Sequence, residues 1–224
     1  MPNWCGNTNI YWTEKEHKEE LQNFFDFIQK QDNLKKEKED FNLTWLCDLL
    51  EANGMNSNRY ECRGYITELS PNIKEKENLV YFRIETDTAW KPMPNAMKAL
   101  TKNYPHLHLA YSSEESGTGI FVTNDRKGKF FKDTWRLETD IYGNKETQKK
   151  IKKKYPLLLQ NSTNYYEEEE GIEYLKELFD LPNISSEKLK ETYEKEIEKF
   201  AQKILKEFPD LELLDLTFQH ISYE

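Results

Sequence analysis

Residues 4–28 read WCGNTNIYWTEKEHKEELQNFFDFI, and this stretch predicts a strand followed by a helix. Trp4, Ile10 and Trp12 stand among Asn and Thr residues, which is typical of a half-buried strand. Thr13 and Glu16 have the spacing of a capping box, in which each side chain bonds a backbone N–H at the other's position. The apolar residues that follow recur at helical spacing: Leu21, Phe24, Phe25 and Ile28. We therefore expect one face of this helix to pack against a sheet.

The remainder of residues 1–142 continues to mix strands and helices. Apolar alternation predicts strands at 60–69, 79–86, 107–111, 119–122 and 130–141. Helical spacing and chain breakers predict helices at 41–52, before Asn53-Gly54, and at 92–104, between Pro92 and Pro105. Strands and helices interleaved in this order indicate an α+β domain built as a split β-α-β sandwich.

Residues 143–224 have a different character. They contain a basic run (145–154), an acidic block (167–170), two helical patterns (171–181 and 186–208) and a terminal strand (211–218). We expect a mainly helical region that ends in a strand and packs on the first domain. The helix, proline and strand of residues 203–213 match those of 99–109, which fits either an internal duplication or convergence on a common turn.

The composition excludes several classes of protein. The 224 residues carry 32 Lys+Arg and 41 Asp+Glu, a formal charge of −9, and 37% are hydrophobic. No apolar stretch approaches the roughly 20 residues of a membrane span, and the first residues lack the pattern of a secretory signal. Cys5, Cys47 and Cys62 are too dispersed for a disulfide framework or a zinc site, so we expect free buried thiols, no metal and no cofactor. We therefore expect a cytoplasmic location.

Three sequence motifs resemble the YubB-type ferredoxin-like proteins, which are encoded mostly by phages, plasmids and other mobile elements. The motifs are the opening MPNWC with Asn7, the CRG at residues 62–64, and TAWKPMP at residues 88–94. The resemblance covers about the first 125 residues. It implies a βαββαβ topology with extra strands. It implies neither an iron–sulfur cluster nor a known biochemical activity.

Six residues are candidates for binding a ligand or partner, and each has a structural alternative. Trp4 can anchor a partner, with Asn7 beside it, but Trp at a first strand usually lies in the core and Asn usually bonds backbone. The guanidinium of Arg63 can grip a carboxylate or phosphate, or pair with one of the many acidic side chains. Trp90 stands between a strand and a helix, where an indole lines a cleft or packs the helix on the sheet. Glu114 and Glu115, near Gly117 and Gly119, fit a tight turn as well as a site.

Histidines and lysines offer weaker signals. His106 and His108 would share one face of a strand, which suits a metal only with a third ligand and otherwise places both outward. The lysines of the run Lys149–Lys154 can contact the phosphates of a nucleic acid, but the net charge of −9 repels such a polyanion. These lysines can instead neutralise the acidic block Glu167–Glu170. Nucleic-acid binding is therefore not expected.

Catalytic motifs are missing from the sequence. We expect a non-enzymatic accessory protein of a mobile element that binds a partner protein. The alternatives are a small-ligand-binding module or enzyme with a cleft near Arg63 and Trp90, and nucleic-acid binding through Lys149–Lys154.

Overall fold

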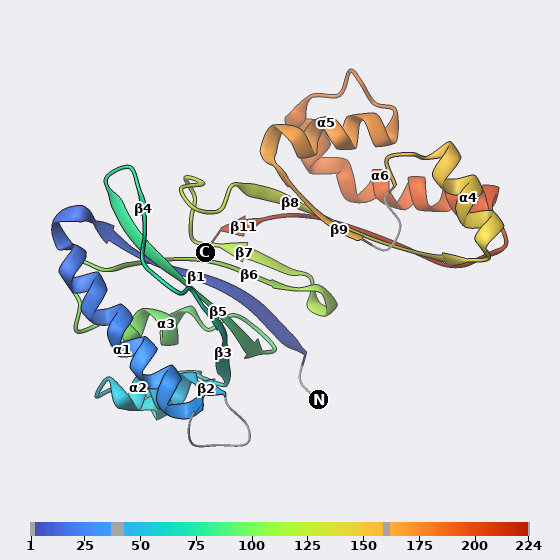
Figure 1. The fold of residues 1–224 in the computed structure, drawn as a ribbon. Coiled ribbons are helices and arrows are strands. Elements are labelled where there is room, and N and C mark those ends of the chain that lie inside the picture. Colours follow the sequence, from blue (N-terminus) through green and yellow to red (C-terminus); the bar gives the residue numbers. More distant parts are fainter. Residues whose placement is uncertain (1–2, 37–42, 159–161, 224) are drawn as a thin grey trace. The chain divides into compact units, whose positions relative to one another are not determined.

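The computed structural model describes residues 3–36, 43–158 and 162–223 of the chain. It divides into two compact units, Met1–Phe131 with Ser222–Glu224, and Lys132–Ile221. Figure 1 shows the elements of each unit. Composition places the boundary between the units at residue 142, whereas in the structure it lies between residues 131 and 132. The reason is that the strand at 133–143 pairs only with strands of the second unit.

The first unit is an eight-stranded sheet with three helices. The strands are β1 (Trp4–Glu14), β2 (Thr44–Trp45), β3 (Gly64–Leu69), β4 (Lys74–Lys76), β5 (Leu79–Ala89), β6 (His108–Glu115), β7 (Ile120–Thr123) and β11 (Ser222–Tyr223). The helices are α1 (Lys18–Lys36), α2 (Leu46–Ala52) and α3 (Pro94–Leu100), and single 3-10 turns occupy Lys15–His17, Ser57–Arg59 and Ser116–Thr118. The strand order is β11-β7-β6-β1-β5-β3-β2, and β4 forms a hairpin with β5.

The helices of this unit pack on one face of its sheet (Figure 1). Tyr11 of β1 lies opposite Phe82 of β5, and both rings contact Phe24 of α1. The Tyr11 hydroxyl, which is fully buried, donates to the carbonyl of Met97 in α3 at 2.9 Å. Aromatic side chains therefore form the centre of this core, and they bury a large area for their number.

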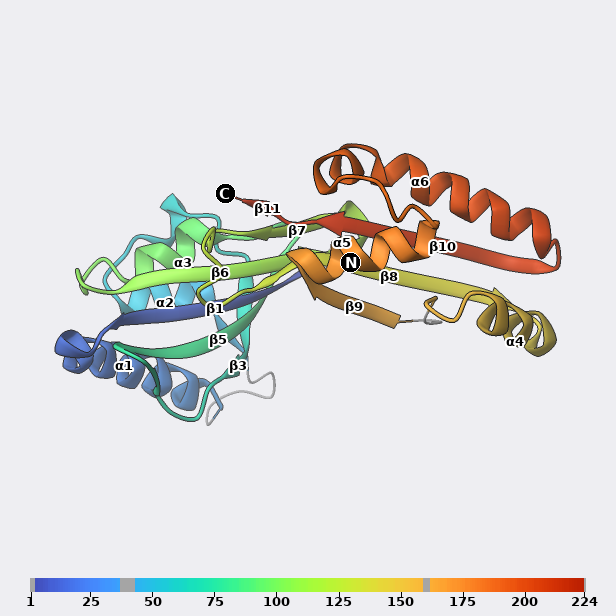
Figure 2. The same cartoon turned by 90° about the horizontal axis from the view of Figure 1, so that it is seen from above.

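The second unit is a three-stranded antiparallel sheet with three helices. The strands are β8 (Asp133–Gly143), β9 (Ser162–Glu167) and β10 (Leu211–His220), and the helices are α4 (Lys145–Lys154), α5 (Glu168–Phe179) and α6 (Ser186–Glu207). In the order β10-β8-β9, β8 is central, as Figure 2 shows. Trp135 and Leu137 of β8 lie in a separate hydrophobic core with side chains of α5 and α6. Within residues 143–224 the three helices are accompanied by β9 and β10, of which the sequence predicted only the terminal strand β10.

Several local predictions differ from the structure. The capping box is wrong: Thr13 belongs to β1 opposite Val80, and its hydroxyl donates to the carbonyl of His106 at 2.9 Å. The predicted helix at 41–52 begins at Leu46, because Thr44 and Trp45 pair with β3; Phe41 lies outside the described residues. The sequence offers Ser185 or Ser186 as the cap of the helix that follows, and in the structure Ser185 caps α6, since its hydroxyl accepts from the Lys188 N–H at 3.3 Å.

The cysteines only partly match the expectation of dispersed buried thiols. Cys5 is completely buried, whereas Cys47 and Cys62 are half-buried, and their thiols are neighbours. In the part of the chain that the structure describes, no helix is both long and apolar enough to cross a membrane.

Candidate functional site

The predicted site residues gather at one end of the first unit's sheet, where β1 begins and β5 ends. Trp4 lies opposite Ala89, and Gly6 lies opposite Glu114 of β6. The backbone N–H of Ala89 donates to the carbonyl of Arg63 at 2.9 Å, which continues the register of β3. Residues from four distant parts of the sequence therefore meet at this sheet end.

Trp90 combines a left-handed backbone with a solvent-exposed side chain. Its φ is 73°, a region that bulky residues rarely adopt, and 52% of its surface is exposed. The backbone is held there because the Trp90 N–H donates to the Asn3 carbonyl at 2.8 Å. The Thr88 hydroxyl closes the turn by donating to the carbonyl of Lys91, also at 2.8 Å. Trp90 is therefore not a core residue, and its exposure favours the binding interpretation over the packing alternative.

Trp4 belongs to a row of aromatic side chains on the sheet face opposite the helices. Its ring meets that of Tyr65 edge to face, with centroids 5.2 Å apart, and Trp45 meets the other side of Tyr65 at 5.4 Å. The Tyr65 hydroxyl donates to the Asp87 carboxylate at 3.3 Å. Trp4 is 38% exposed, so it is not a core residue, although Cys5 beside it is. The sequence did not single out Trp45 or Tyr65, because only the strand register brings them to Trp4.

Asn7 is buried and bonded within the sheet, which agrees with its structural alternative. Its side chain is buried on the helix-covered face, where the amide donates to the carbonyls of Cys5 (2.8 Å) and Thr86 (3.0 Å) and to the Thr88 hydroxyl (2.9 Å). Asn9 forms a similar bond to the Thr86 hydroxyl at 3.2 Å. This buried network ties β1 to β5 directly beneath the turn that carries Trp90. Burial also raises the pKa of the Cys5 thiol to about 11, so Cys5 is no nucleophile.

Arg63 is exposed at the same sheet end. Across the residues that the structure describes, neither Arg63 nor Arg59 forms an ion pair, so the pairing with an acidic side chain that was expected for Arg63 is absent. A guanidinium without a carboxylate partner can still bind a planar anionic group from outside.

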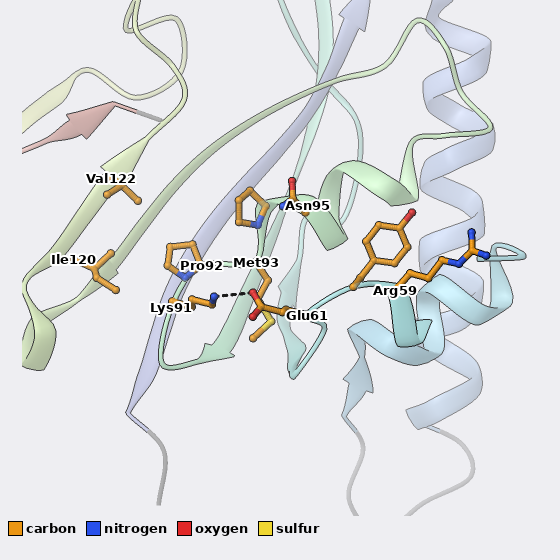
Figure 3. A pocket seen from close by; sticks show the side chains of 10 residues that line it. Arg59, Glu61, Lys91, Pro92, Met93, Asn95, Ile120 and Val122 are labelled. Carbon is orange, nitrogen blue, oxygen red and sulfur yellow. Dashed lines mark ion pairs between the residues drawn. The ribbon is translucent and has the colours of Figure 1, made fainter. Parts of the chain in front are cut away.

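A cleft of about 540 Å³ lies beside these residues on the helix-covered face (Figure 3). Residues that line it are Arg59, Tyr60, Glu61, Lys91, Pro92, Met93, Pro94, Asn95, Ile120 and Val122. Ile120 and Val122 project from β7 and form one wall, and a Lys91–Glu61 ion pair of 2.7 Å lies across from them. Trp90 and Arg63 do not line the cleft themselves. Trp90 directly precedes Lys91, and Arg63 follows Glu61 by two residues, and both Lys91 and Glu61 line the cleft.

The two candidate glutamates have different roles. The Glu115 carboxylate accepts hydrogen bonds from the backbone N–H groups of Gly117 (2.8 Å) and Thr118 (2.6 Å). A further bond from the Thr118 hydroxyl, followed by these backbone bonds, lowers the pKa of Glu115 despite its burial. Glu115 therefore stabilises the turn after β6, as its structural alternative predicted. Glu114 lies opposite Gly6, which places it on the same sheet face as Trp4.

The histidines do not form a metal site in this structure. His106 precedes β6, where it stacks on His17 at 3.7 Å and contacts the Glu20 carboxylate at 2.7 Å. His108 stacks on Trp12 at 4.4 Å. Within the described ranges, no group of three or more His, Cys, Asp or Glu side chains is arranged to hold a metal ion.

The lysine run forms helix α4 and pairs with acids other than the predicted block. Lys150 pairs with Glu146 at 2.8 Å, and Lys154 pairs with Glu207 of α6 at 2.7 Å. Glu168 of the acidic block instead contacts Lys190 and His220. The idea that these lysines neutralise Glu167–Glu170 is therefore wrong for the pairs that the structure describes.

Comparisons with known proteins add little to this geometry. No family model matches the chain, and no curated protein matches it. Among solved structures, the chain is similar to a crystal structure of an unknown protein from Galdieria sulphuraria, with 6% sequence identity and a TM-score of 0.28. That alignment covers 98% of this chain and 99% of the other. Such a low TM-score carries no argument about fold or function.

Proposed function

We propose that this protein is a non-enzymatic binding protein whose first unit recognises a segment of a partner protein at the Trp4–Trp90 end of its sheet. The exposed, left-handed Trp90 is the observation that carries this proposal. A strained backbone costs on the order of 1–3 kcal/mol, and such strain clusters at ligand clamps and other functional positions. An indole exposed in this way offers a large, rigid contact area to a partner.

The surroundings of Trp90 define the chemistry that such a segment needs. Ile120 and Val122 in the cleft wall offer apolar contacts. Arg63 does not line the cleft, but its guanidinium, which forms no ion pair, is exposed at the same end of the sheet. We therefore infer a segment with an apolar side chain that enters the cleft and a carboxylate that reaches Arg63. The acidic surface of the whole chain does not favour such a segment at long range, so short-range contacts must supply the affinity.

Selection from a random peptide library displayed on phage tests this proposal. The full chain is the bait, and the Trp90→Asn variant is the counter-bait, because Asn tolerates a positive φ and preserves the turn. We expect enriched peptides to bind the wild-type chain at least about tenfold more tightly than the variant, a loss of about 1.4 kcal/mol. Leu205→Asn, which changes an exposed apolar residue of the second unit, is the matched control. Peptides that bind all three chains equally would contradict the proposal.

A small apolar ligand in the cleft is the second candidate function. It is favoured by the cleft's volume of about 540 Å³, within the range of about 300–1,000 Å³ that small-molecule sites occupy. Thermal-shift screening of a small-molecule library separates the two candidates, because Val122→Asp would abolish a small-ligand shift whereas Trp90→Asn would leave it unchanged.

The finer fold and family assignments are also proposals. In the first unit, β1, α1, β3, β5, α3 and β6 follow one another as βαββαβ, and four of these strands lie side by side in the order β6-β1-β5-β3. This arrangement supports a ferredoxin-like core that β2, β4, β7 and β11 extend. The YubB-type family, a mobile-element origin and a cytoplasmic location remain proposals that rest on the sequence motifs and on the absence of a signal pattern.

A further inference from the structure

Two half-buried thiols meet where α2 contacts the segment before β3. Trp45 of β2 lies opposite Tyr65 of β3 in an antiparallel pair. Cys47 follows Trp45 by two residues and Cys62 precedes Tyr65 by three, so both cysteines leave that pair at the same end. This register explains why residues 15 apart in sequence have neighbouring side chains.

Hydrogen bonds hold the segment of Cys62 against α2. The Ser57 hydroxyl donates to the Glu51 carboxylate of α2 at 2.7 Å, and the Cys62 thiol donates to the Ser57 carbonyl at 3.7 Å. The Tyr60 N–H also donates to the Ser57 carbonyl, at 3.0 Å. The segment that carries Cys62 is therefore held against α2, and the Cys62 thiol lies near that of Cys47.

We propose that Cys47 and Cys62 form a reversible disulfide and are a redox modification site of this protein. Cys5 cannot take part, because it is completely buried in the network around Asn7. Both partners are only half-buried, so a small oxidant can reach them. The oxidant class is a small-molecule disulfide such as oxidised glutathione.

The reaction proceeds by two thiol–disulfide exchanges. One cysteine thiolate attacks a sulfur of oxidised glutathione, which forms a mixed disulfide and releases one glutathione thiolate. The second cysteine thiolate attacks the protein sulfur of that mixed disulfide and releases the second glutathione. Two protein thiols are oxidised to one disulfide, two protons leave them, and one oxidised glutathione is reduced to two thiols.

Acidic neighbours set the pH at which this exchange runs. Burial raises the pKa of Cys62, and the adjacent Cys47 thiol and Glu51 raise it further. Burial and the Asp48 carboxylate likewise raise the pKa of Cys47. Because the thiolate is the nucleophile, we expect the rate to increase as the pH rises above neutrality.

Equilibration of the full-length chain in glutathione buffers tests the proposal. After acid quenching, alkylation and proteolysis, we expect a peptide linked through Cys47 and Cys62, and an alkylated Cys5. The ratio [GSH]²/[GSSG] at half-linkage should be at least about tenfold higher for the folded chain than in urea, because folding holds the thiols together. Equal values in both conditions would overturn the proposal.

Serine variants distinguish a specific pair from general thiol oxidation. Cys5→Ser should link like the wild type, whereas Cys47→Ser and Cys62→Ser should each carry only a glutathione adduct on the remaining partner. Glutathione adducts on both cysteines of the Cys5→Ser chain, without a linked peptide, would also overturn the proposal. None of these readouts depends on the proposed binding function.

Discussion

Trp90 has an exposed indole on a strained backbone. A substitution of this residue should therefore weaken the binding of a partner without lowering the stability of the fold. Replacing it by Asn keeps the turn while it relieves a left-handed conformation that costs L-residues roughly 1–2 kcal/mol. We expect Trp90→Asn to be as stable as the wild type or more stable by up to about 1 kcal/mol, as measured by urea unfolding. A loss of more than about 1 kcal/mol would show that the indole is a packing residue after all.

Replacement of Asn7, unlike that of Trp90, should destabilise the first unit, because the Asn7 amide is buried and makes three hydrogen bonds. Asn7→Ala would leave buried carbonyl and hydroxyl groups without a donor. We expect the first unit to lose about 2–3 kcal/mol of unfolding free energy. Asn72→Ala, at an exposed position of the β3–β4 turn, is the matched control and should change stability by less than about 0.5 kcal/mol.

At the scale of elements, Glu168 at the start of α5 joins α6 and β10. Although burial raises its pKa, the contacts with the Lys190 ammonium and the His220 ring lower it to about 2. A carboxyl group with a depressed folded pKa stabilises the fold above its unfolded pKa of about 4.5, and this stabilisation is lost as the pH falls toward 2. Since a third of the side chain is exposed, solvent screening reduces the effect to the order of 1 kcal/mol.

The Glu168→Gln variant checks this linkage. We expect it to be less stable than the wild type at pH 7, and the difference should shrink between about pH 4.5 and pH 2 as wild-type Glu168 becomes protonated. Urea unfolding, followed by the fluorescence of Trp135 across this pH range, measures it. A difference that is independent of pH would contradict the assigned ion pairs.

Gly171 determines how closely α5 approaches β8. A Cβ there would lie 2.6 Å from Cγ of Trp135, and that indole is too buried to move. The helix propensity gained by Gly171→Ala, about 1 kcal/mol, is smaller than the overpacking cost, so we expect a net loss of about 1–2 kcal/mol. Gly6→Ala meets nothing within 4 Å, so thermal unfolding of that control should show no comparable packing penalty.

Elements with strong internal patterns were predictable from the sequence, and those that depend on distant partners were not. Helix α6 has an apolar stripe and a Ser185 cap, so local residues define it. Strand β9 escaped prediction because STNYYE has little apolar alternation and is held by pairing with β8. The sheet end that joins Trp4, Arg63 and Trp90 depends on register, which alternation within single strands does not reveal. The neighbouring positions of Cys47 and Cys62 also depend on strand register, so the sequence did not predict them.

At the scale of the whole molecule, the two units have separate hydrophobic cores. All described strands and helices of residues 132–221 pack within the second unit. We therefore expect a fragment of these residues to fold alone, with a cooperative urea transition and a buried Trp135. A fragment without a cooperative transition would show that the second unit depends on the first.

Binding of a protein segment at the Trp4–Trp90 end of the first unit can be followed at single tryptophans. An NMR titration of a selected peptide into the ¹⁵N-labelled full-length chain tests it through the indole N–H signals of its five tryptophans. We expect the Trp90 and Trp4 signals to shift on binding while that of Trp135 stays in place. Binding that shifts Trp135 alone, or that leaves Trp4 and Trp90 unchanged, would contradict it.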